Sequence, residues 1–159
     1  MKNPLFSFLL ILVFVVQGWT YQDSPTKAPK LAGRYLVEFQ LEDLLGKIEL
    51  KFKAQAKGSG SFLLLTPRSN LQPPATPTPA VYTQIGGEVS FSSEVVFPLG
   101  NCCQLPGTLV FKGVFDSPET ISGKVIFIST TQDEKGQLVV RVNTGSFTAK
   151  PFVESEKKE

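Results

Sequence analysis

The two cysteines of this chain, Cys102 and Cys103, are neighbours and form its most distinctive chemical feature. Neighbouring Cα atoms lie about 3.8 Å apart across a trans peptide, below the roughly 4.4–6.8 Å usual across a disulfide. A vicinal disulfide would therefore be strained and reducible, and would suit a rigid apolar platform or a redox switch. Two buried thiols and a disulfide joining two chains are the alternatives. We predict a vicinal or intermolecular disulfide at this pair.

The chain has no histidine, which removes most of the common catalytic and metal chemistry. A Ser-His-Asp triad, a Cys-His dyad, a His-bearing zinc site and a histidine pH switch all need that side chain. A soft-metal site at the cysteines also lacks the third and fourth ligands that tight binding requires. We therefore expect no metal, no cofactor and no catalytic residue of these classes.

Paired carboxylates are the remaining route to an enzyme, because two such groups flanking a bond can hydrolyse a glycoside. Glu38, Glu49, Glu88 and Glu94 all fall on predicted strands, on the polar side of the alternation. That side faces outward in a barrel, whereas in a two-sheet sandwich it can line a groove. An extracytoplasmic hydrolase is accordingly the alternative function.

The ends of the chain differ in composition from its middle. Residues 1–18 combine Lys2 with an uncharged apolar run from Leu5 to Val16, which predicts a cleaved signal peptide and an exported protein. The run is shorter than the roughly 20 residues of a membrane-spanning helix, so no span is expected after cleavage. Residues 19–32 are predicted to be a flexible leader and residues 151–159 a charged tail. The formal charge of +2 does not predict nucleic-acid binding.

The middle of the chain, residues 33–150, alternates apolar and polar residues with period two, which is typical of half-buried strands. The clearest run is Ile48 to Gln55, and no stretch shows the three-and-four spacing of a helix. Short turns separate seven or eight such strands. We predict an all-β domain, an antiparallel meander closing into a small barrel, with a two-sheet sandwich as the alternative.

Short motifs carry a resemblance to known families. Gly33-Arg34-Tyr35 resembles the G-x-W start of lipocalin-type and avidin-type (calycin) barrels, with Tyr in place of Trp. The glycine spacing of residues 107–115, 121–130 and 145–149 is similar to that of avidin-like meanders. The resemblance implies a calycin-type barrel over residues 33–150. The whole chain also resembles the uncharacterised secreted β-proteins of environmental bacteria, which implies a secreted or periplasmic location.

Phenylalanine dominates the aromatic set, with 13 residues. Most of these rings are expected to fill the core, because an eight-stranded barrel is either filled by side chains or holds one small ligand. The alternative is an apolar lumen, and Arg141 is the one polar residue that alternation could turn inward. The aromatic residues that would line such a lumen are Tyr35, Phe39, Phe91, Phe111 and Phe127.

These observations favour a secreted, non-enzymatic binding or interaction module. Its expected partner is a small apolar ligand or a protein of the cell envelope. The hydrolase described above and a purely structural envelope protein are the alternatives.

Overall fold

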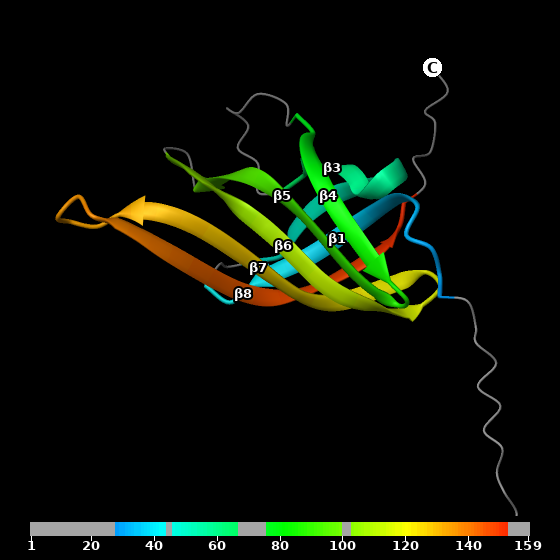
Figure 1. The fold of residues 1–159 in the computed structure, drawn as a ribbon. Coiled ribbons are helices and arrows are strands. Elements are labelled where there is room, and N and C mark those ends of the chain that lie inside the picture. The colour runs from blue at the N-terminus through cyan, green and yellow to red at the C-terminus, as the bar shows by residue number, and fades with distance from the viewer. Residues whose placement is uncertain (1–27, 44–45, 67–75, 100–102, 153–159) are drawn as a thin grey trace, which may run out of the picture.

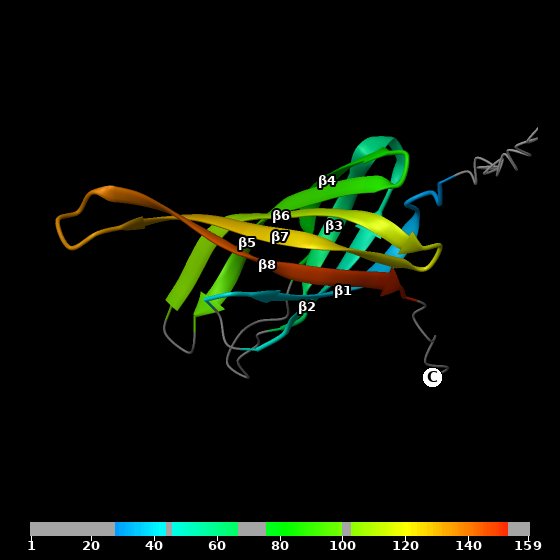
Figure 2. The same cartoon turned by 90° about the horizontal axis from the view of Figure 1, so that it is seen from below.

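A computed structural model describes residues 28–43, 46–66, 76–99 and 103–152, and it contains eight strands and one short 3-10 helix, η1 (Ala56–Gly58). Each strand pairs antiparallel with its neighbours in the chain, and β8 returns to pair with β1 (Figures 1 and 2). The strands are β1 (Gly33–Leu41), β2 (Ile48–Ala54), β3 (Ser59–Leu64), β4 (Thr78–Ile85), β5 (Glu88–Leu99), β6 (Cys103–Ser117), β7 (Thr120–Gln132) and β8 (Leu138–Pro151).

The strand order is that of a closed up-and-down barrel, so the predicted meander is confirmed and the sandwich alternative is not what forms. Closure follows from the register of β8, which runs without interruption from Leu138 to Pro151. Residues 138–144 pair with β7 only, residues 145–149 pair with both β7 and β1, and residues 150–151 pair with β1 only. Closing the sheet in this way satisfies backbone groups that an open sheet would leave at its edges.

The period-two pattern of the sequence becomes the two faces of the barrel wall. In β1 and β2 every second residue is buried, including Val37 and Leu50, whereas the residues between them are partly or fully exposed. The buried apolar side chains form one continuous core. Burial of such side chains is the main stabilising contribution in a domain of this size.

Phenylalanine rings occupy the centre of this core. Phe91 stacks between Phe52 and Phe111, with ring centroids 4.7 and 4.8 Å away. Phe62 and Phe147 meet the same ring edge-on at 5.9 and 5.6 Å. Offset stacks and edge-to-face contacts are the favoured arrangements of aromatic rings. The interlocking of rings from β2, β3, β5, β6 and β8 fixes the strands relative to one another.

Residues 28–32 form a short strap that packs against one end of the barrel. Leu31 is fully buried in the core, and its backbone N–H donates to Oε1 of Gln84 over 2.8 Å. The Nε2 of Gln84 donates to the carbonyl oxygens of Pro29 and Gly86, over 2.5 and 3.0 Å. One apolar side chain at the barrel end and one amide thus hold residues 28–32 in place, and the rest of the expected leader, residues 19–27, lies outside the described residues.

The domain also extends slightly beyond residue 150. β8 ends at Pro151, and the N–H of Phe152 donates to the carbonyl oxygen of Arg34 over 2.8 Å. The Nζ of Lys51 lies 4.5 Å from the centre of the Phe152 ring, within cation–π range. The expected charged tail, 151–159, therefore has its first two residues on the barrel wall. In the described part of the chain, no helix is long and apolar enough to cross a membrane.

Replacing Gln84 with alanine is expected to release the strap, because this one side chain holds the backbone of both Leu31 and Pro29 through hydrogen bonds. We expect a loss of about 1–3 kcal/mol in the free energy of unfolding. Limited trypsin digestion should then cut faster after Lys30, which is exposed. The control is Gln132→Ala, an exposed glutamine on β7. Equal cleavage of both variants and of the wild type would contradict this role.

Candidate functional site

The five aromatic residues proposed as lumen lining all face the barrel interior, where each is at most 4% exposed. They pack on one another or on neighbouring rings: Phe39 meets Phe111 at 5.3 Å, and Phe127 meets Phe97 at 4.8 Å. Burial raises the pKa of the Tyr35 hydroxyl above its ordinary value, although a backbone hydrogen bond with Ala32 opposes this. The packing favours the filled core over the lumen, and ligand binding inside stays a prediction.

The structure describes only part of the cysteine pair, the backbone of Cys103. Cys102 lies outside the described residues, as does the side chain of Cys103. The backbone of Cys103 begins β6 and pairs with Leu99. The disulfide therefore stays a prediction.

The four candidate carboxylates lie on the barrel wall and point away from its interior. Glu38 and Glu49 are directly opposite in the β1–β2 register, so two of them do meet. Glu38 lines a shallow outer hollow of ≈ 600 Å³ with Lys47 and Lys124, but Glu49 is not among its lining residues. Glu88 and Glu94 are exposed on β5. This arrangement does not place a carboxylate pair inside one cleft, which the hydrolase alternative requires.

A hairpin projects from the end of the barrel opposite the strap (Figures 1 and 2). Pairing of β7 with β6 ends at Ser129, and pairing of β8 with β1 ends at Gly145. Between these points, residues 130–143 form a two-stranded extension that we call the arm. Arg141 is in the arm, opposite Ser129. It keeps the inward phase of the alternation but is exposed beyond the barrel rim, so it places no charge in the core.

A second outer hollow lies beside the arm and, at ≈ 750 Å³, is larger than the hollow that Glu38 lines. It forms where the β5–β6 and β7–β8 hairpins separate, past the last β6–β7 pair, Gly107 with Ser129. Pro106 comes next and has no backbone N–H with which to continue the ladder. We call this hollow the groove. The residues lining it are Thr78, Pro79, Glu94, Val95, Val96, Pro106, Gly107, Thr108, Ile128 and Thr130.

Apolar side chains dominate the groove. Val96 is 52% exposed and Ile128 is 39% exposed, although both are large aliphatic residues. Thr108 and Thr130 add hydroxyl groups and Glu94 adds one carboxylate. A site with mainly apolar walls and a few polar groups is the usual chemistry of a ligand-binding or protein-binding surface.

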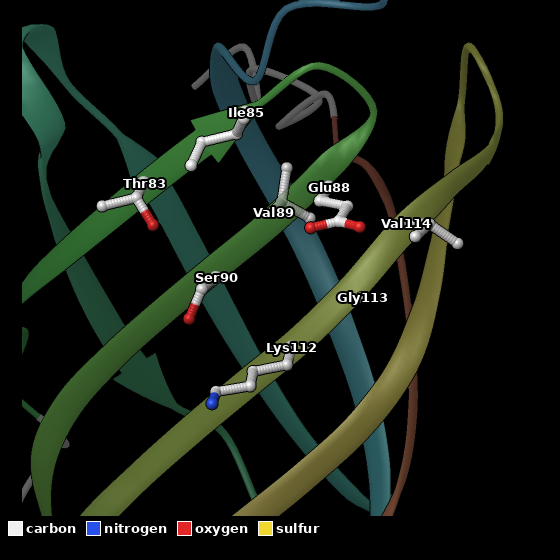
Figure 3. A pocket seen from close by; sticks show the side chains of 8 residues that line it. All are labelled: Thr83, Ile85, Glu88, Val89, Ser90, Lys112, Gly113 and Val114. Atoms are coloured by element: carbon white, nitrogen blue, oxygen red, sulfur yellow. The ribbon is translucent and has the colours of Figure 1, made fainter.

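A smaller hollow of ≈ 320 Å³ lies near the strap end, over β4, β5 and β6 (Figure 3). Ile85 and Val114 give it exposed apolar surface, whereas Glu88 and Lys112 bring charges of opposite sign. It is less than half the size of the groove and more charged. The groove is therefore the better candidate site.

Sequence reasoning missed the groove and the arm, although one signal was present. Residues 138–142 (LVVRV) place apolar side chains on both sides of a strand, a pattern that one-sided burial does not require. In the structure Leu138, Val140 and Val142 are all mostly exposed. An apolar residue at an outward position of a strand indicates an exposed apolar surface.

Comparison with known proteins gives matches at the level of structure. No family model matches the chain, and no curated protein matches it. The crystal structure of rhizavidin is similar, with a TM-score of 0.46 and 12% identity over 79% of this chain and 88% of that chain. Intact afifavidin in its apo form is similar with a TM-score of 0.45 and 14% identity, over 78% of this chain and 87% of that chain. The similarity is in the path of the backbone, and the barrel itself is established by the strand register.

Proposed function

We propose that this protein is an exported, non-enzymatic binding module that contacts apolar groups of its partner through the groove on its outer face. The observation that carries the proposal is the exposure of Val96 and Ile128 beside Pro106 in a hollow of ≈ 750 Å³. Apolar surface exposed in one hollow is stabilised when a partner removes it from water.

The packed interior supports an outer site. A ligand inside the barrel would have to displace rings such as Phe91 and Phe111, whose centroids are 4.8 Å apart. Displacing one buried ring costs several kcal/mol of packing free energy, which a small ligand would have to restore. A ligand at the groove meets surface that is already open. The outer wall is therefore the easier place to bind.

The partner class follows from the groove's lining. Two aliphatic side chains and Pro106 suit an aliphatic or aromatic group, and the hydroxyl groups of Thr108 and Thr130 can bond a neighbouring polar atom. Export, predicted from residues 1–18, would present this surface to an envelope protein or to a small extracellular apolar molecule. The groove's chemistry fits both.

A fluorescent apolar dye tests the groove. Anilinonaphthalene sulfonate is expected to bind the wild type. Val96→Gln should weaken binding about five- to tenfold, because the dye can no longer cover the exposed half of the apolar Val96 side chain. The control is Val81→Gln on β4, a position that is 64% exposed but lies outside the groove. Thermal melting of each variant checks that the dye reports the folded state. Equal binding by both variants would contradict the proposal.

A further inference from the structure

The arm leaves one backbone edge of β8 open. Pairing between β8 and β1 stops at Gly145 opposite Leu41, and one further hydrogen bond joins the N–H of Glu42 to the carbonyl oxygen of Thr144, over 2.8 Å. Beyond it, none of the described strands pairs with residues 138–143 on that side, and only β7 pairs with them on the other.

Alternation identifies the backbone groups that face the open edge. Backbone N–H and C=O groups of successive strand residues point to opposite sides. The carbonyl of Thr144 points toward β1, whereas that of Gln137 points toward β7, where it accepts the N–H of Asp133 over 2.9 Å. Both observations give the same phase. Leu138, Val140 and Val142 therefore present three N–H and three C=O groups to the open edge.

The same three residues carry exposed apolar side chains. Leu138 is 74% exposed, Val140 is 64% exposed and Val142 is 57% exposed, all on the outer face of the arm. Natural edge strands are usually guarded by charges, prolines or bulges against pairing with another strand. No charged residue or proline occupies these three positions, and the β7–β8 register is continuous here. This open edge suits strand addition.

The arm is preorganised for such pairing by its own turn. One carboxylate oxygen of Asp133, Oδ1, accepts the N–H groups of Lys135 and Gln137 over 2.9 and 2.8 Å. The N–H of Gly136 also donates to the carbonyl oxygen of Asp133 over 3.0 Å. A two-stranded ribbon is only marginally stable by itself, so an added strand stabilises it. A preformed edge also lowers the ordering cost of association.

We infer that this edge pairs with the same edge of a second copy of the chain, antiparallel, with a two-fold axis through Val140. In that register Val140 faces its equivalent and Leu138 faces Val142 of the second copy, so the apolar row is complementary to itself. Arg141 faces Val139 of the second copy, and no two like charges lie directly opposite each other. The small formal charge of the chain, +2, adds little repulsion between copies.

The size of the contact sets its expected strength. Six residues on each side form an interface at the small end of specific contacts, below about 1,200 Å² in total. The dimer should therefore be weak and depend on concentration. A two-fold contact closes on itself, so association should stop at two copies. This self-association goes beyond the binding proposed for the groove, which borders the β6 side of β7, whereas the open edge is the side of β8 that faces away from β7.

Sedimentation equilibrium of the full chain, expressed with residues 1–18 in place so that its native processing occurs, tests the inference. The wild type should pass from monomer to dimer as its concentration rises. Val140→Pro removes only an N–H that faces the open edge, so the β7–β8 ladder stays intact. It removes two hydrogen bonds per dimer and should weaken dimerisation at least about tenfold.

A second pair of variants separates the edge from general surface effects. Val140→Lys should prevent dimerisation, because it places a charge at the centre of the proposed contact. Val81→Lys is the matched control: Val81 is also 64% exposed but lies on β4, away from the open edge, so this variant should dimerise like the wild type. A wild type that stays monomeric throughout, association beyond two copies, or equal behaviour of the two lysine variants would overturn the inference. Dye binding distinguishes the groove: Val140→Pro should keep it, and Val96→Gln should keep dimerisation.

Discussion

Replacing Phe91 with alanine is expected to lower the free energy of unfolding by about 3–5 kcal/mol, the usual cost of removing a buried ring. Phe91 is 1% exposed and lies at the centre of the core. Two rings stack on its faces and two meet it edge-on. Because the neighbouring rings come from four other strands, the wall cannot collapse inward to close the gap. Much of the lost volume should remain as a cavity.

Chemical denaturation monitored by circular dichroism measures this loss. Phe91→Leu keeps most of the volume and should cost only about 1 kcal/mol. If Phe91→Ala is too unstable to purify, the leucine variant still gives a value. A loss below about 1 kcal/mol for the alanine variant would show that this ring is not closely packed, and would restore the lumen as a place for a ligand.

Replacing Gly145 with alanine is expected to cost about 3 kcal/mol, through the seam that closes the barrel. A Cβ at this position would overlap the carbonyl oxygen of Gln40 and lie 3.0 Å from the Cα of Leu41. Both contacts are with backbone atoms of β1, which cannot rotate away. The strands β1 and β8 must therefore separate at the point where their pairing begins.

Gly87→Ala is the matched control, because no heavy atom lies within 4 Å of a Cβ built there and its φ is not positive. It should be neutral within about 0.5 kcal/mol. Amide hydrogen exchange locates the effect: in Gly145→Ala the β1 amides should exchange faster than those of β5. Equal stability of the two alanine variants would contradict the tight approach of β8 to β1.

The fold was predictable because its pattern is local. Alternation in Ile48 to Gln55 marks a half-buried strand without reference to the rest of the chain. Turn sequences such as Gly86-Gly87 then divide the strands, and short connections favour a meander. The sequence favoured a closed barrel over a sandwich but did not decide between them. Closure depends on the pairing of β1 with β8, whose paired residues are more than a hundred positions apart in the chain.

The candidate site was not predictable from such patterns. The groove exists because pairing between β6 and β7 stops after Gly107, a property of the register that Pro106 suggests only afterwards. The burial of Leu31 depends on Gln84, which lies 53 positions away. Local periodicity carries no information on either contact. The carboxylates behaved as the alternation predicts, on the outer face.

Methyl NMR during a titration with anilinonaphthalene sulfonate tests the central claim, that binding occurs on the outer wall and not inside the barrel. Dye should shift the methyl signals of Val96 and Ile128, which line the groove. The methyl signals of Val37 and Leu50, fully buried in the core, should stay in place. Shifts of the two core residues, with Val96 and Ile128 unchanged, would contradict the account and place the ligand in the interior.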